Sequence, residues 1–205
     1  MNFIFDIGNV LINFRPKEFL HALHPEQSDA NKMYEVIFQS SEWVQLDRGV
    51  ISQEDATNLF CIREPEYKQL VIATMSRLEE MLTLIPETVE LLTEIKAHGH
   101  KLYYLSNYHE KLRDYIKEQN SFFNLFDGGV FSCDIHEIKP FPEIYKHLLR
   151  EYDLIPSECL FIDDVDENVK CAESLGMRAV VFTSAEETRK YISRWLGAKQ
   201  EILQR

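Results

Sequence analysis

Six polar residues stand at or just after short apolar runs, at four separate places along the chain. Each run has the length and composition of a buried strand. In a parallel α/β sheet, ligands bind at the carboxyl ends of the strands. We therefore expect these side chains to share one site at that edge of a sheet. The residues are Asp6, Ser106, Asn107, Lys139, Asp163 and Asp164.

The carboxylates in this set predict a divalent metal ion. A carboxylate at the end of a buried strand is costly to desolvate unless a cation or hydrogen bonds meet it. Mg²⁺ prefers oxygen ligands in an octahedron and usually keeps several waters. We expect one oxygen each from Asp6 and Asp164 as ligands, joined by the main-chain carbonyl of Gly8. Asp163 would then bind a water ligand of the metal without contacting the metal itself.

The same set predicts nucleophilic chemistry on a phosphoryl group. Lys139 would offset the negative charge and bridge Asp6 to the phosphoryl oxygens. The Ser106 hydroxyl and the Asn107 backbone N–H would bind those oxygens. Asp6 would attack in line and form an aspartyl-phosphate that water later hydrolyses. The expected ligand is a small-molecule phosphate ester, and Mg²⁺ is the expected cofactor.

Two parts of the chain differ in their periodicity. From Ile85 onwards, helical and strand patterns alternate, which favours an α/β fold with a parallel sheet covered by helices. Between Phe14 and Leu84 the pattern is helical, with no convincing strand. We expect a Rossmann-like core with helices on both faces, formed by residues 1–14 and 85–205, and an inserted all-helical cap over residues 15–84. Strands are predicted over residues 2–5, 101–105, 128–135, 159–162 and 178–182.

Composition excludes several classes of protein. The 205 residues are 45% hydrophobic and carry a formal net charge of -12, which argues against nucleic acid or an anionic membrane as partner. The four cysteines have no CxxC spacing, so we expect reduced thiols and neither a zinc site nor disulfides. The apolar N-terminus is far shorter than the ~20 residues of a membrane span. We expect a cytoplasmic protein that is a monomer or a homodimer.

The motifs FDIGNVL, LSN, IKP and FIDDVDEN stand in the order and spacing of the four motifs of the haloacid dehalogenase superfamily. The chain resembles that superfamily over the core on both sides of the insertion. The resemblance implies Asp6 as nucleophile and metal ligand, Ser106 as phosphate ligand, Lys139 as charge stabiliser and Asp164 as metal ligand. The inserted helices look like a C1-type cap, with SSEWVQLDRGVIS similar to a cap segment of bacterial phosphatases. The FDxGNV form of the first motif is similar to that of bacterial phosphatases active on glucose 1-phosphate.

One position departs from the commonest family pattern. Most phosphatases of the superfamily carry a second aspartate two residues after the nucleophile, as general acid and base, where this chain has Gly8. Glycine cannot protonate a leaving group. The sequence therefore predicts that the departing oxygen leaves largely as an anion or takes its proton from water or the substrate. Rates should then fall as the leaving group becomes more basic, so that sugar 1-phosphates outperform sugar 6-phosphates.

Two other functions stay open. A metal-independent 2-haloacid dehalogenase would use the same aspartate on a carbon centre, but the adjacent Asp163 and Asp164 would repel an anionic haloacid. A catalytically silent binding or regulatory module would explain Gly8 as a mark of lost chemistry, but it would not need Asp6, Lys139 and Asp164.

Residues outside the four motifs carry weaker hypotheses. Arg48 and Tyr108 are candidate substrate contacts, because the cap and the loop after the second core strand face the same cleft. His109 is expected near the mouth of the site, and Trp43 in the core of the cap. Asn168 is either a partner of the aspartates or a helix surface residue.

Overall fold

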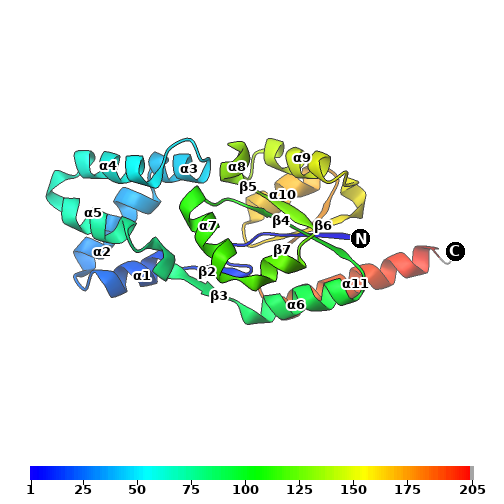
Figure 1. Cartoon of the computed structure of the whole chain (residues 1–205). Helices are drawn as coiled ribbons and strands as arrows, with labels where there is room; N and C mark the ends of the chain where they lie inside the picture. The colour runs from blue at the N-terminus through cyan, green and yellow to red at the C-terminus, as the bar shows by residue number, and fades with distance from the viewer. Residues whose placement is uncertain (204–205) are drawn as a thin grey trace.

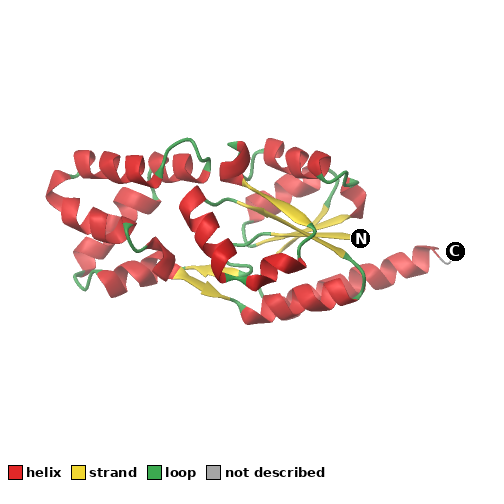
Figure 2. Cartoon of the chain, viewed as in Figure 1, coloured by secondary structure: helices red, strands yellow, loops and turns green. Residues whose placement is uncertain are grey.

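A five-stranded parallel sheet lies at the centre of the computed structural model, which describes residues 1–203 (Figures 1 and 2). The strand order is β5-β4-β1-β6-β7, so the first strand of the chain is central and pairs on both sides. This confirms the predicted Rossmann-like parallel sheet. The strands are β1 (Asn2–Phe5), β4 (Lys101–Ser106), β5 (Gly128–Phe131), β6 (Cys159–Asp163) and β7 (Arg178–Val181).

Helices cover both faces of this sheet, as the sequence predicts. Side chains alternate along a strand, so Phe3 and Phe5 point into one core while Ile4 points into the other. Helices α6, α7 and α11 pack in the first core, and α9 and α10 pack in the second. The helices are α6 (Pro86–Ala97), α7 (Glu110–Gln119), α9 (Pro142–Glu151), α10 (Asp166–Ser174) and α11 (Ala185–Leu203), with 3-10 turns η4 (Ser121–Leu125) and η5 (Pro156–Glu158).

One predicted strand is too long. The apolar pattern of residues 128–135 suggested a single strand, but β5 ends at Phe131 and a short helix, α8 (Ser132–Ile135), follows it. Ser132 is fully buried and its hydroxyl contacts the backbone of Tyr108 and of Asp47. These tertiary contacts, rather than the local pattern, fix the turn of the chain at Ser132.

A second group of helices packs to one side of the sheet (Figure 1). Two of them begin at side-chain caps, since Ser40 accepts a hydrogen bond from the Trp43 N–H and Ser52 forms a capping box with Asp55. They are α1 (Pro16–Leu23), α2 (Gln27–Met33), the π-helix η1 (Tyr34–Phe38), α3 (Ser41–Asp47), α4 (Gln53–Arg63), η2 (Pro65–Tyr67), α5 (Lys68–Met75) and η3 (Leu78–Met81).

The two connections between these helices and the sheet form an antiparallel ribbon, which the sequence did not predict. β2 (Ile12–Phe14) pairs with β3 (Leu82–Leu84), with Asn13 opposite Thr83. Three residues are too few to show a period of two, so only the pairing across 70 positions reveals these strands. The Asn13 amide also donates to the Thr83 hydroxyl at 3.0 Å. The two connections are therefore held side by side.

Candidate active site

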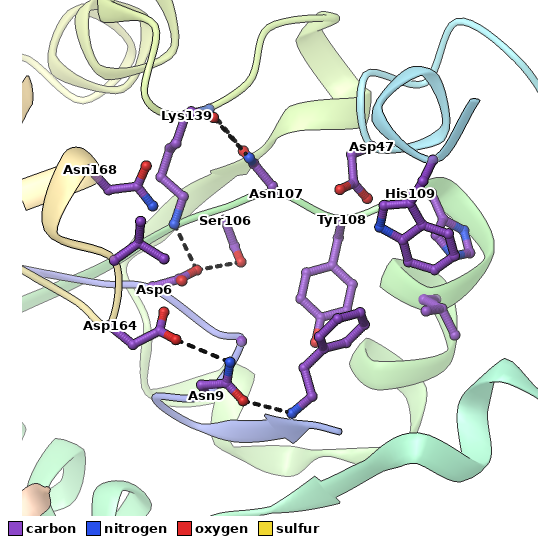
Figure 3. Close-up of a pocket in the computed structure, with 15 residues that line it drawn as sticks. Asp6, Asn9, Asp47, Ser106, Asn107, Tyr108, His109, Lys139, Asp164 and Asn168 are labelled. Atoms are coloured by element: carbon purple, nitrogen blue, oxygen red, sulfur yellow. Dashed lines mark hydrogen bonds and ion pairs between the residues drawn. The ribbon is translucent and has the colours of Figure 1, made fainter. Parts of the chain in front are cut away.

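A pocket of about 190 Å³ lies at the carboxyl ends of the core strands, beneath α3 (Figure 3). We call one part of its wall the strand-end side and the other the cap side. The strand-end side consists of Asp6, Ser106, Asn107, Lys139 and Asp164. The cap side consists of Trp43 and Asp47 of α3 together with Phe14 and three residues of the core that follow β4, namely Tyr108, His109 and Leu112. The six residues singled out in the sequence thus converge, although Asp163 lies just behind this wall.

Asp6 follows β1 directly and is buried, with three donors on one carboxylate oxygen. Its Oδ1 accepts hydrogen bonds from the Ser106 hydroxyl at 2.6 Å and from the Ile7 N–H at 2.7 Å. The ammonium of Lys139 lies 2.8 Å from the same oxygen. Burial raises the pKa of Asp6, and the charge of Lys139 opposes that rise. These contacts fix the carboxylate in one orientation.

Lys139 is the positive centre of the strand-end side. Its buried Nζ also lies 2.6 Å from Oδ2 of Asp163, which is fully buried at the end of β6. Burial disfavours the charge on Lys139, but the attraction of Asp163 and Asp6 outweighs it and raises the pKa of the ammonium. Lys139 therefore remains a cation between two carboxylates.

Asn107 holds the backbone that carries Lys139. Its side-chain amide donates to the Lys139 carbonyl at 3.1 Å and accepts from the Lys139 N–H at 2.9 Å (Figure 3). The Asn107 side chain is thus engaged in positioning. The role expected for its backbone N–H in binding phosphoryl oxygens stays a prediction.

The two adjacent aspartates have different surroundings. Both carboxylate oxygens of Asp163 have hydrogen-bond donors, because the Asn168 amide and the Val165 N–H donate to it in addition to Lys139. Asp164 faces the pocket, and the Asn9 amide donates a hydrogen bond to it at 3.0 Å. Of the two alternatives for Asn168, the buried partner of the aspartates is therefore the one observed.

Asn9, which was not among the residues predicted from the sequence, links the site to the β2–β3 ribbon. Its backbone has a φ of 52°, a left-handed conformation that asparagine adopts more readily than most residues. Its side-chain oxygen accepts from the Phe14 N–H at 2.9 Å, while its amide donates to Asp164 (Figure 3). The sequence feature that could have indicated Asn9 is the Asn-Val pair that follows Gly8 in the first motif.

The carboxylates fit a hard divalent cation. Single ligand atoms of Asp6, Asp163 and Asp164 lie within 4.8 Å of one another. Burial raises the pKa of Asp164, and its repulsion with Asp163 adds to this rise. A cation would relieve that repulsion. Because the oxygens of Asp163 already have donors, Asp6 and Asp164 are the available side-chain ligands.

Gly8 leaves space at the position where the superfamily that the sequence resembles commonly carries an aspartate. It lines the pocket, and a Cβ added there would meet nothing within 4 Å. An acidic side chain at this position would therefore not clash. In this chain Gly8 offers only backbone atoms to the pocket.

The cap side combines aromatic surface with polar atoms that lack partners. The Tyr108 hydroxyl and His109 Nε2 are buried, and neither has a hydrogen-bond partner among the described residues. The Trp43 ring meets the His109 ring edge to face, at 5.5 Å between centroids. Burial lowers the pKa of His109 to about 4, so this imidazole is neutral at pH 7.

One of two residues differs from its expected place. Trp43, expected in the core of the cap, packs there against Phe38 and also lines the pocket. Arg48, a candidate substrate contact, does not line this pocket and instead lies over the Phe141 ring at 5.6 Å. Neither position follows from local sequence, because α3 meets the core only in the folded chain.

Residues 1–176 match the family model of haloacid dehalogenase-like hydrolases. The chain therefore belongs to that family and is a hydrolase. It is 27% identical to a sesquiterpene phosphatase of Aspergillus oryzae, with 95% of each chain covered. It is 23% identical to a D-ribitol-5-phosphate phosphatase of Bacteroides thetaiotaomicron, over 85% of this chain and 88% of that one.

A solved structure agrees with the fold. A HAD family enzyme of Bacteroides thetaiotaomicron, in complex with magnesium and inorganic phosphate, superposes with a TM-score of 0.70 at 20% identity, covering 89% of this chain and 93% of that one. The chain spans 60%, 37% and 15% of the length of three other curated relatives. Within the described residues, no helix is long and apolar enough to span a membrane.

Proposed function

We propose that this hydrolase is a Mg²⁺-dependent phosphatase that cleaves a small phosphate ester through an aspartyl-phosphate on Asp6. The observation that carries the proposal is the network of Asp6, Ser106 and Lys139 at the base of the pocket. The Asp164 carboxylate, which faces the same pocket, lies beside it. The similarity to two phosphatases supports the same reaction class.

Each strand-end residue has a distinct task in this reaction. Asp6 attacks the phosphorus atom, with its carboxylate held by Ser106 and Lys139. Ser106 and the Asn107 backbone bind phosphoryl oxygens, and Lys139 stabilises the charge that develops on them. Mg²⁺ would be held by Asp6, Asp164 and the Gly8 carbonyl, with Asp163 behind them, and supplies charge neutralisation when bound.

The cap side favours a polyol phosphate as substrate. Trp43 and Phe14 offer aromatic surface, while the Tyr108 hydroxyl and His109 Nε2 need hydrogen-bond partners that substrate hydroxyls would provide. We therefore propose a sugar phosphate, consistent with the resemblance of FDxGNV to glucose 1-phosphate phosphatases and with the ribitol-5-phosphate phosphatase relative.

We further propose that residues 1–14 and 85–205 act as the catalytic domain and residues 15–84 as a C1-type cap. The β2–β3 ribbon is the only described connection between them along the chain, and it is short. A cap on such a ribbon excludes water from the phosphoryl transfer when it closes.

A panel of phosphorylated metabolites, assayed for phosphate release, tests the proposal. Hydrolysis is expected with Mg²⁺ and is expected to be lost in excess EDTA and in Asp6→Asn. Full phosphate release with the chelator would contradict the role of Mg²⁺. No phosphate release, with chelator-resistant halide release from a 2-haloacid, would favour the metal-independent dehalogenase alternative. The absence of a labelled aspartyl-phosphate and of turnover would favour the silent module.

A further inference from the structure

Asp47 is the acidic residue that the helices over residues 16–81 contribute to the wall of the pocket. It stands at the last position of α3, one turn after Trp43, which lines the same cavity. Figure 3 shows its carboxylate directed toward the middle of the pocket, across from Asp6 and Ser106. A ligand that reaches Asp6 would therefore pass beside Asp47.

Three contacts hold residues 47–49 against the core. The Ser132 hydroxyl donates to the Asp47 carbonyl, and the His136 ring contacts the Arg48 carbonyl at 2.9 Å. Gly49 follows with a φ of 67°, and a Cβ there would lie 2.5 Å from the Cys133 carbonyl oxygen. This close approach requires glycine. The end of α3 is thus fixed to α8.

The carboxylate itself lacks a partner. Among the described residues, no group donates a hydrogen bond to it and no cation pairs with it. Burial raises the pKa of Asp47 to about 7, against the attraction of Lys139. The other ionisable groups that line the pocket are Asp6, Tyr108, His109, Lys139 and Asp164. Of these, burial keeps Tyr108 and His109 neutral near pH 7.

We propose that Asp47 is the general acid and base of the reaction, supplying from the cap the proton that Gly8 cannot. This rests on the proposed phosphatase function. As Asp6 attacks and the bond from phosphorus to the leaving oxygen breaks, the proton of Asp47 moves to that oxygen. The resulting Asp47 carboxylate then takes a proton from the water that attacks the aspartyl-phosphate. The bond from phosphorus to Asp6 breaks, phosphate leaves, and Asp47 is protonated again.

This assignment revises the leaving-group expectation drawn from Gly8. With an acid in place, basic alkoxides leave as alcohols, so alkyl phosphates need not be poor substrates. Removing the acid should make the rate fall steeply again as the leaving group becomes more basic. A leaving group as acidic as nitrophenol needs no proton, so it separates proton donation from substrate binding.

The test compares Asp47→Asn with the unmodified protein on an alkyl phosphate and on 4-nitrophenyl phosphate, both with Mg²⁺. Without the acid, kcat/KM for the alkyl ester should fall by ~10² to 10⁴-fold, whereas kcat/KM for the aryl ester should change less than about 10-fold. Loss of the base should also slow the second step for both esters. A burst of nitrophenol equal to the enzyme concentration should therefore appear.

Two further variants complete the experiment. Asp114→Asn makes the same chemical change on the exposed face of α7 and should leave both esters unaffected. Gly8→Asp in the Asp47→Asn protein should recover alkyl ester hydrolysis, since the pocket has space there. Equal losses of kcat/KM for both esters, or no loss, would overturn the role of Asp47. No phosphate release from either ester by the unmodified protein would overturn the proposed function, and this role with it.

Discussion

The two sides of the pocket differ in how their polar groups are paired. On the strand-end side, Asp6, Ser106 and Lys139 bond to one another, and Lys139 also pairs with Asp163 behind the wall. On the cap side, the Tyr108 hydroxyl and His109 Nε2 are buried without a partner among the described residues, and the half-buried Asp47 carboxylate receives no hydrogen bond from that part of the chain. A buried polar group without a partner is costly, so the cap side is the part that a ligand would complete. The strand-end side is organised before any ligand arrives.

The largest effect is expected from breaking the paired side at Lys139. Lys139→Met leaves Asp6 and Asp163 buried without their cation, so the free energy of unfolding should fall by about 3 to 5 kcal/mol and turnover should be lost. Urea denaturation measures this. The matched Lys190→Met removes the exposed ion pairs with Glu186 and Glu187 and should change the free energy of unfolding far less. Similar losses in the two variants would mean that the buried network contributes no more than a surface pair.

The second prediction separates the two adjacent aspartates. Asp164→Asn removes a proposed Mg²⁺ ligand and should weaken Mg²⁺ binding by more than ~100-fold, whereas Asp163→Asn, which acts from behind, should weaken it by ~10 to 100-fold. Isothermal titration with Mg²⁺ measures both. The reverse order would exchange their assigned roles.

A smaller effect is expected where the cap side meets the core. Ser132→Ala removes the donor to the Asp47 carbonyl and the acceptor of the Tyr108 N–H, which should cost about 1 to 3 kcal/mol. Amide hydrogen exchange in α3 should rise, because the end of that helix loses an anchor. Ser174→Ala, which removes an exposed hydroxyl that bonds the Cys171 carbonyl, serves as control. Unchanged exchange in α3 would show that Ser132 does not hold the cap.

The smallest effect concerns a paired network away from the pocket. Burial opposes the charge on Asp127, but hydrogen bonds from Lys101, Lys96 and the Leu102 N–H lower its pKa to about 2. Its pKa in the unfolded chain is ~3.9, so the carboxylate stabilises the fold above about pH 4 and loses this effect as the pH falls toward 2. Asp127→Asn should therefore lower stability by about 1 kcal/mol at pH 7. Thermal unfolding should show this deficit disappearing near pH 2.

The sequence by itself determined the parallel sheet and the strand-end side. The apolar runs before Asp6, Ser106 and Asp163 are long enough to identify strands, and parallel strands bring their carboxyl ends to one edge whatever the details of packing. Lys139 could be assigned through the family motifs, and the sequence already placed Asp164 at the metal with Asp163 behind it. The ion pair between Lys139 and Asp163 is visible only in the structure, which places Asp163 inside and Asp164 at the wall.

Only the tertiary structure decided the cap side. The β2–β3 ribbon depends on pairing between distant three-residue segments, and α8 begins where Ser132 meets Tyr108 and Asp47. Nothing in the local pattern around Asp47 says that its carboxylate turns toward Asp6 while the neighbouring Arg48 turns toward Phe141. The sequence specifies a helix there, but the docking of α3 on α8 sets which side chain faces the pocket. Strand ends are aligned by backbone hydrogen bonds, whereas a cap residue is aimed by packing between segments far apart in the chain.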